Sequence, residues 1–264
     1  MEFLDTATGS LHVSVQGPAN GPAIIFANSL GTDFRIWDRV LPLLPAGLRV
    51  IRYDKRGHGL SDLARGEWGM GDHVADAAAV MEWADASDGV IVGLSVGGMI
   101  AQGLAAERPD LIRGMVLCDT GAKIGSPDMW GDRIAALRAD GLDAMADTVM
   151  ERWFSRAFRA GRPAELAVWR NMLTRTPLEG YINVCAAIAE TDLKESTARL
   201  RIPAMAMVGD EDGSTPPDLV RETAELIPGS AFHIVRGAGH LPCIEQPKAT
   251  AALIGDFLAG IGHV

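Results

Sequence analysis

Short apolar segments alternate along this chain with segments whose apolar residues recur every three or four positions. The apolar runs are Leu11–Gln16, Ile24–Ala27, Arg49–Tyr53, Gly89–Leu94, Gly114–Cys118, Ala204–Val208 and Ala231–Val235. The helical patterns are Trp37–Leu44, Gly71–Ala86, Val96–Glu107, Pro217–Ile227 and Pro247–Ala259. Such alternation is typical of a mostly parallel sheet with helices on both faces. The sequence predicts one doubly wound α/β sheet, with Leu11–Gln16 at its edge and ligands beyond the carboxyl ends of its strands.

The alternation stops between about Ser126 and Arg199, where only helical patterns remain. Ser126-Pro127 is typical of a helix start, and Pro177 predicts a second start. A chain of 264 residues has room for one α/β core and a small insert. We therefore expect a helical cap at residues 126–199, inserted in a core formed by residues 1–125 and 200–264.

Composition excludes several classes of function. The formal net charge of -10 disfavours binding to nucleic acid or to anionic membranes. Cys118, Cys185 and Cys243 are widely spaced and form neither a disulfide framework nor a zinc motif. The first ten residues lack the pattern of a secretory signal, and the glycine-rich apolar stretch Val90–Ala106 suits a buried strand and helix better than a membrane span. We expect a cytoplasmic protein with a small-molecule substrate and without a cofactor or metal.

The segment Gly93-Leu94-Ser95-Val96-Gly97 matches the G-x-S-x-G pattern of a nucleophile elbow. The pattern also arises by chance in a glycine-rich chain, but here a predicted strand precedes it and a helical pattern follows it. A tight turn between strand and helix has room only for small residues beside the serine. The N-terminus of the helix would also direct backbone N–H groups towards charge that develops on a substrate. Ser95 is the candidate nucleophile.

A serine nucleophile needs a histidine as base and a carboxylate to orient that histidine. His240 follows Gly237-Ala238-Gly239 after the last predicted strand, whereas His233 lies inside that strand and His263 at an end that we expect to be frayed. The remaining three histidines precede Ser95, and the expected chain order is serine, acid, histidine. His240 is therefore the candidate base, with a packing or capping role as the alternative.

The acid is expected in the loop after Ala204–Val208, which carries Asp210, Glu211 and Asp212. Asp212 is favoured because it lies furthest into the loop, and the other two are then turn or solvent-facing residues. Asp119, directly after another strand, is the outside candidate.

Two backbone N–H groups should form the oxyanion hole: that of Val96, after the nucleophile, and that of Leu30, in the loop Asn28–Asp33. The polar segment Asp54–Ser61 follows another strand. We interpret it as a structural turn.

These motifs together resemble the α/β-hydrolase superfamily. More narrowly, Asn28–Asp33, Ala122–Gly125, Glu151–Phe154, Phe158-Arg159 and Gly180-Tyr181 resemble 3-oxoadipate enol-lactonases, including in the insert, where hydrolases of different substrates diverge most. Pro242-Cys243 departs from the Ser-Asn expected there. The resemblance implies hydrolysis of 3-oxoadipate enol-lactone to 3-oxoadipate, late in bacterial breakdown of protocatechuate and catechol, without a cofactor.

The insert should supply the contacts that select the substrate. Arg133 lies three residues after Trp130, so both side chains share one helix face, and an arginine grips a carboxylate in two-point fashion. Trp130, Arg133 and Trp153 are the candidate substrate-binding residues, and the alternatives are a solvated Arg133 and aromatic residues that only form the core of the insert. The competing arginines are Arg152, Arg156, Arg159 and Arg170. The alternative functions are a carboxylesterase, a carbon–carbon bond hydrolase and a small-molecule receptor on the same scaffold.

Overall fold

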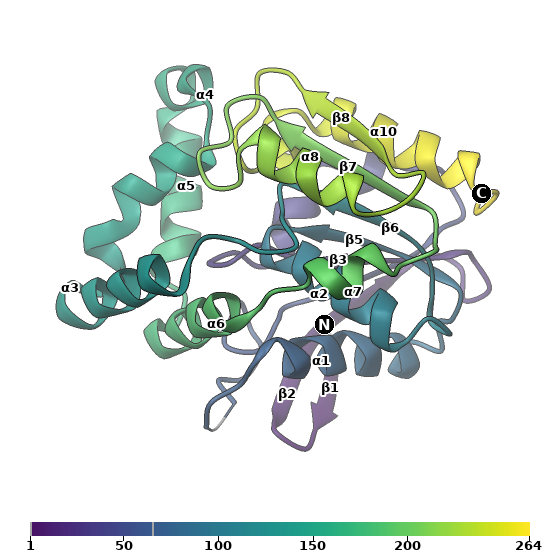
Figure 1. Cartoon of the computed structure of the whole chain (residues 1–264), viewed down its shortest axis with the longest axis horizontal. Helices are drawn as coiled ribbons and strands as arrows, with labels where there is room; N and C mark the ends of the chain where they lie inside the picture. The colour runs from purple at the N-terminus through teal and green to yellow at the C-terminus, as the bar shows by residue number, and fades with distance from the viewer. Residues whose placement is uncertain (1, 65) are drawn as a thin grey trace.

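A computed structural model describes residues 2–64 and 66–264 and contains one eight-stranded sheet in the order β1-β2-β4-β3-β5-β6-β7-β8 (Figure 1). The strands are β1 (Glu2–Thr6), β2 (Gly9–Gln16), β3 (Ala23–Ala27), β4 (Arg49–Tyr53), β5 (Gly89–Leu94), β6 (Ile112–Cys118), β7 (Ala204–Gly209) and β8 (Ala231–Val235). From β4 to β8 all neighbouring strands run parallel, and β2 pairs antiparallel with β1 and β4. The predicted mostly parallel sheet is confirmed.

The amino-terminal edge of the sheet differs from the prediction. β1 forms the edge and pairs with β2 from Glu2–Val13 to Thr6–Gly9, so β2 lies inside the sheet. β1 was missed because its sequence, EFLDT, is mostly exposed and contains no apolar run. Strands β3 and β5, by contrast, are buried along their whole length, which is why their apolar runs identified them.

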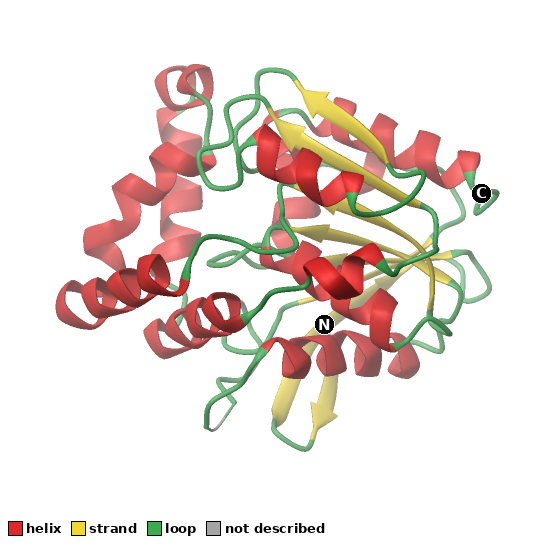
Figure 2. Ribbon diagram, in the orientation of Figure 1, coloured by secondary structure: helices red, strands yellow, loops and turns green. Residues whose placement is uncertain are grey.

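Helices cover both faces of the sheet (Figure 2). Helices α1 (Met70–Trp83), α2 (Val96–Glu107) and α8 (Pro217–Glu225) cover one face, where α2 contacts β5 and β6 and α8 contacts β7. Helix α10 (Pro247–Gly260) covers the other face together with the short α9 (Pro242–Glu245).

Two expectations about chain segments on this second face were wrong. The helix predicted at Trp37–Leu44 is two 3-10 turns, η1 (Phe34–Trp37) and η2 (Leu41–Leu43), because Pro42 lies within the second one and lacks a backbone N–H. His263 is not in a frayed end: it is buried, and its Nε2 lies 2.9 Å from the Ala23 carbonyl oxygen.

The segment without strands forms a layer of helices beyond the carboxyl ends of the parallel strands (Figure 1). This layer consists of α3 (Pro127–Trp153), α4 (Arg156–Gly161), α5 (Pro163–Thr174) and α6 (Leu178–Glu190), and the segment ends with the short α7 (Lys194–Ala198), which lies over the core. Helix α3 starts as predicted, with Ser126 Oγ accepting from Met129 N, and is kinked at Gly141. Pro177 is the N-cap residue of α6. Helix α7 contacts α2 of the core. We keep residues 126–199 as the proposed cap.

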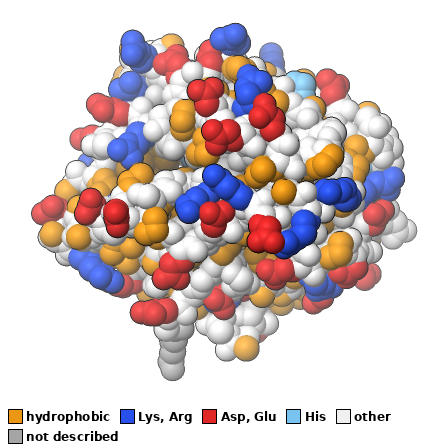
Figure 3. Space-filling model, in the orientation of Figure 1, with side chains coloured by type: hydrophobic (Ala, Val, Ile, Leu, Met, Phe, Trp, Pro, Cys, Tyr) orange, Lys and Arg blue, Asp and Glu red, His pale blue; other side chains and the backbone are white. Residues whose placement is uncertain are grey.

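The surface mixes charges of both signs. Acidic and basic side chains are interspersed over the face in Figure 3, which agrees with a modest excess of acidic residues rather than a basic stripe. Within residues 2–64 and 66–264, no helix is long and apolar enough to cross a membrane.

Gly97, at the start of α2, is expected to be irreplaceable. A Cβ there would lie 2.2 Å from the Ala27 carbonyl oxygen, so Gly97→Ala must push α2 away from β3. At Gly131, an exposed position in α3, a Cβ meets nothing within 4 Å. We expect Gly97→Ala to lower the free energy of unfolding by more than about 3 kcal/mol, and Gly131→Ala to raise it by about 0.5–1 kcal/mol. Urea unfolding of both variants measures this, and equal effects would contradict it.

Candidate active site

Ser95 lies in the sharp turn between β5 and α2. Its backbone adopts φ 58° and ψ -120°, a strained conformation for a residue with a side chain. Glycines flank it because the turn is crowded: a Cβ on Gly93 would lie 2.2 Å from Gly97 O, and one on Gly98 would lie 2.5 Å from Thr120 Cγ2. Two hydrogen bonds also tie the turn to the end of β6 and the loop that follows it. Thr120 Oγ1 donates to Ser95 O at 2.6 Å, and Ser95 N donates to Cys118 O at 3.0 Å. The turn therefore presents Ser95 at the carboxyl edge of the sheet.

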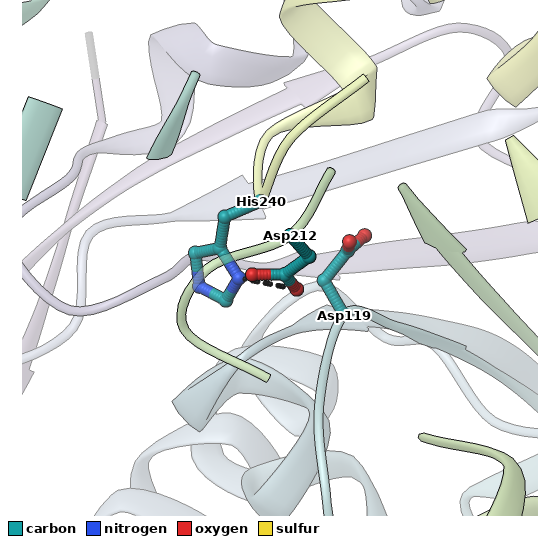
Figure 4. Close-up of side chains that lie close together, drawn as sticks. All are labelled: Asp119, Asp212 and His240. Atoms are coloured by element: carbon teal, nitrogen blue, oxygen red, sulfur yellow. Dashed lines mark hydrogen bonds and ion pairs between the residues drawn. The ribbon is translucent and has the colours of Figure 1, made fainter. Parts of the chain in front are cut away.

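His240 and Asp212 meet beside this turn (Figure 4). His240 Nδ1 lies 2.9 Å from Asp212 Oδ2, and both side chains are buried. The other bonds to the Asp212 carboxylate come from Ser214 N at 2.7 Å, Thr215 N at 3.1 Å and Thr215 Oγ1 at 2.7 Å. Burial opposes ionisation, but His240 and these donors lower the pKa of Asp212 below its ordinary value. An ionised Asp212 accepts the Nδ1–H of His240, which leaves Nε2 as the basic nitrogen.

Asp119 is close to this pair, but its carboxyl group has a different orientation and a different pKa shift. Its carboxyl group is turned away from His240 in Figure 4, and its Oδ1 accepts from Gly209 N at 2.9 Å. Burial, followed by the charge of Asp212, raises the pKa of Asp119 well above its ordinary value. Asp119 therefore ionises less readily than Asp212 and is the weaker partner for an imidazolium.

The same three residues bring possible metal ligands together, because one atom from each lies within 4.8 Å of the others. The hydrogen bond between His240 Nδ1 and Asp212 fits an acid and base pair better than a cation site.

The other two acids of the loop after β7 have separate contacts. Asp210 Oδ1 accepts from Gly237 N at 2.7 Å and from Ala238 N at 3.3 Å, so this carboxylate shapes the turn that leads to His240. Glu211 Oε2 accepts from Arg156 N at 3.0 Å. Neither carboxylate is bonded to His240.

The loop after β3 supplies backbone donors on the opposite side of Ser95. In the described part of the chain, neither Leu30 N–H nor Val96 N–H donates to another protein group. Ser29 Oγ lies 3.5 Å from His240 Nε2, so the loop and the histidine face one another. The two free N–H groups are available to a developing oxyanion.

Ser95, His240 and Leu30 line one cavity of about 100 Å³, whose wall includes residues of the cap. The core residues Ile124 and Gly125 also line it, and the cap residues of its wall are Met129, Trp130, Arg133, Arg152, Trp153, Tyr181 and Ile188. The expected face of Trp130 and Arg133 therefore points to the cavity, and Trp153 lies beside it. The Arg133 guanidinium lies 5.5 Å from the Trp130 ring centroid and 5.6 Å from that of Tyr181, and Arg133 Nη2 donates to Tyr181 Oη.

The four competing arginines differ in where their side chains lie relative to the cavity. Arg152 shares the cavity wall with Arg133. Arg170 is bound to Asp143 and Asp147 on the surface, and Arg159 Nε donates to Phe154 O. Arg156 lines a different groove.

Glu245 is a site residue that sequence reasoning missed. It is buried in α9, and its carboxylate accepts from Gly239 N at 2.6 Å and from Ser155 Oγ at 2.5 Å. Burial raises the pKa of Glu245 above its ordinary value. One carboxylate thereby joins the residue before His240 to the cap. The proximity of Glu245 to His240 in the chain was a signal, but its partner Ser155 is distant in sequence.

Comparison with known proteins agrees with this geometry. A family model described as alpha/beta hydrolase fold matches residues 22–247. The chain is 31% identical over 250 residues to 3-oxoadipate enol-lactonase 2 of Acinetobacter baylyi, covering 94% of this chain and 93% of that protein.

Solved structures give the same result. The enol-lactonase from Burkholderia xenovorans LB400 superposes with a TM-score of 0.94 at 33% identity and covers 98% of this chain and 100% of its own. A thermophilic esterase from Thermogutta terrifontis, solved with malate bound, has a TM-score of 0.92 at 26% identity and covers 100% of both chains.

Replacement of Ser95 tests whether this residue is the nucleophile. We expect Ser95→Ala to fold normally and to lower turnover by several orders of magnitude, because the members of a triad act as a unit. Steady-state kinetics on an activated ester, with circular dichroism as a folding control, measures this. Activity within about tenfold of the wild type would exclude the serine mechanism.

Three isosteric amide variants test which acid serves His240. We expect Asp212→Asn to lower kcat by about 10⁴-fold, because an amide reverses the hydrogen bond to Nδ1. Asp210→Asn retains an accepting oxygen for Gly237 N and should be nearly normal in activity. A larger loss in Asp210→Asn than in Asp212→Asn would reassign the acid.

The third variant, Asp119→Asn, should remain active, because His240 is bonded to Asp212 and an amide at position 119 keeps an accepting oxygen for Gly209 N. The raised pKa of Asp119 also has a consequence for stability. Above the ordinary pKa of a carboxyl group, the unfolded chain releases this proton, whereas the folded chain holds it to a higher pH. The free energy of unfolding of the wild type should therefore fall relative to that of Asp119→Asn as the pH rises above about 4. Urea unfolding between pH 4 and pH 7 measures this difference, and a constant difference would contradict it.

Proposed function

The chain belongs to the α/β-hydrolase fold family and is a hydrolase, and from this premise we propose that it opens 3-oxoadipate enol-lactone to 3-oxoadipate through an acyl-enzyme on Ser95. The observation that carries the proposal is the cavity in which Ser95 and His240 face Arg133 and two tryptophans of the cap. Such a site suits a small, flat ester with one carboxylate. The identity to relatives named 3-oxoadipate enol-lactonase supports this substrate over other small esters.

The reaction begins with proton transfer from Ser95 Oγ to His240 Nε2. Asp212 stabilises the imidazolium, and Oγ attacks the lactone carbonyl. The Leu30 and Val96 N–H groups donate to the oxyanion of the tetrahedral intermediate. The ring C–O bond then breaks, and the enol oxygen leaves with the proton from His240.

The leaving group favours ring opening. An enol is more acidic than an ordinary alcohol and converts to a ketone, so the reverse attack on the acyl-enzyme is suppressed. His240 next takes a proton from water, the resulting hydroxide attacks the acyl carbonyl, and the proton returns to Ser95 Oγ. The product is 3-oxoadipate, in keeping with a late step of protocatechuate and catechol breakdown.

Arg133 is the proposed partner of the substrate carboxylate, which would be costly to bury unpaired. Its Nε is buried and has no hydrogen-bond partner among the described residues, although Nη2 is bonded to Tyr181. An arginine with a free donor beside an indole can hold a carboxylate while Trp130 and Trp153 cover the ring. Arg152 is the second cation in the wall.

The choice between lactonase and esterase is tested by progress curves on the enol-lactone and on an uncharged aryl ester. The similarity to the Thermogutta terrifontis esterase is the observation that favours the alternative. We expect kcat/KM for the lactone to exceed that for the ester by more than about a hundredfold. Equal values, or a preference for the ester, would favour the esterase.

Arg133→Met tests recognition of the carboxylate. A charge-assisted hydrogen bond contributes about 1.5–3 kcal/mol, so we expect kcat/KM for the carboxylated lactone to fall about ten- to a hundredfold, with little change for the uncharged ester. Arg138→Met removes an exposed arginine from the same helix and is the matched control. An equal loss on both substrates, or no loss, would remove Arg133 from this role, and a selective loss in Arg152→Met alone would transfer the role to Arg152.

A further inference from the structure

A lysine is buried directly beneath the loop that carries the Leu30 N–H. We propose that Lys55 is a positioning residue for the oxyanion hole: it holds and polarises the Ser29–Leu30 peptide through the Ser29 carbonyl, so that the Leu30 N–H is aimed at the reacting carbonyl. The inference rests on the serine mechanism proposed above. It gives a function to the segment Asp54–Ser61, which the sequence suggested only as a turn.

The contacts of Lys55 are confined to this loop. Its side chain is 1% exposed, and Nζ lies 2.5 Å from Ser29 O and 3.2 Å from Thr32 O. Among the described residues, 2–64 and 66–264, no carboxylate oxygen lies within 4.0 Å of Lys55 Nζ. A buried ammonium with two carbonyl partners and no carboxylate is a costly arrangement for stability alone. The free-energy cost of burying this ammonium is a reason to infer that its charge acts on the proposed oxyanion hole.

Peptide geometry transmits this contact to the cavity. The Ser29–Leu30 bond is trans, so its C=O and N–H point in opposite directions. Because Lys55 Nζ binds the Ser29 carbonyl oxygen, the Leu30 N–H on the other side of this peptide points away from Lys55. Leu30 itself lines the cavity that contains Ser95. Among the described residues this N–H has no protein acceptor, which leaves it for the substrate.

The ammonium supplies charge that a neutral donor does not. Thr32 Oγ1 already donates to Ser29 O at 2.9 Å, so the carbonyl would not lose every donor without Lys55. A cation at the carbonyl oxygen polarises the whole peptide and makes its N–H a stronger donor in this low-dielectric setting. Burial lowers the pKa of Lys55 to about 7, against the opposing charges of Asp54 and Asp33. Negative charge developing on the bound substrate would favour the protonated amine.

A second residue of the same segment fixes the next peptide. Thr32 N donates to Ser29 O at 3.3 Å, and Gly31 has φ +73°, as in a type II turn with glycine at its third position. Gly31 N donates to His58 Nε2 at 3.0 Å. Burial and the charge of Lys55 lower the pKa of His58 well below its ordinary value, so the ring stays neutral and keeps the accepting nitrogen. Lys55 and His58 thus hold consecutive peptides of the loop.

The test replaces Lys55 with methionine, which has similar length but no donor or charge. On an aryl ester, Lys55→Met should lower kcat about 10- to 100-fold, somewhat less than loss of a complete oxyanion donor. KM should change by less than about threefold, because uniform binding is retained. A phenylboronic acid, which forms a tetrahedral adduct on Ser95, should bind more weakly by the same factor as kcat falls. Lys55→Gln, which keeps an uncharged donor, should lose less than Lys55→Met but still more than about twofold relative to the wild type.

Ser61→Ala is the matched control. It removes two buried hydrogen bonds of the same turn: Ser61 Oγ donates to Asp54 O at 2.5 Å and accepts from His12 N at 2.8 Å. Neither bond involves Ser29–Thr32. It should lower the unfolding midpoint and leave kcat and boronate affinity unchanged. The inference is overturned if Lys55→Met or Lys55→Gln, folded by circular dichroism, keeps kcat and boronate affinity within about twofold of the wild type. The aryl ester makes the result independent of whether the enol-lactone is the substrate.

Discussion

The close approach of α2 to β3 at the turn around Ser95 is the constraint on which the rest of the site depends. The Gly97 and Ala27 backbones touch, and this contact is possible only without a Cβ at Gly97. The turn it creates holds Ser95 in a left-handed conformation at the carboxyl edge of the sheet. The same closeness places the Val96 N–H near the loop after β3. One backbone contact therefore positions both Ser95, the proposed nucleophile, and Val96, a proposed oxyanion donor.

Electrostatic environment then gives each buried carboxyl group a different task. Asp212 accepts bonds from Ser214, Thr215 and His240, which lower its pKa, whereas Asp119 has one backbone donor and its pKa is raised by burial. Glu245 is equally buried but joins Gly239 to Ser155. Two ionised carboxylates as close as Asp119 and Asp212 would repel one another. The charge of Asp212 accordingly adds to burial in raising the pKa of Asp119.

The cap and the core act on the oxyanion loop from opposite sides. A Cβ on Gly31 would lie 2.6 Å from Leu173 and 2.9 Å from Tyr181, so the cap lies directly against the loop. Lys55 and His58 hold the loop from the core side. Tyr181 also bonds to Arg133, the proposed carboxylate partner. The proposed carboxylate partner and the proposed oxyanion loop therefore contact the same residue, Tyr181.

The sequence by itself determined the sheet, its helical layers and the elbow, because buried strands such as β5 and tight turns such as Gly93–Gly97 leave local signatures. It missed β1, whose pairing with β2 depends on a partner strand rather than on an apolar run. It also left Asp119 open as the acid and ranked Arg133 against four other arginines. In the folded chain His240 is bonded to Asp212, and Arg133 and Arg152 share the cavity wall, because hydrogen-bond partners and cavity walls depend on contacts between residues far apart in the chain. For the same reason Glu245 and Lys55 gained their places in the site only when the folded chain brought Ser155 and Ser29 against them.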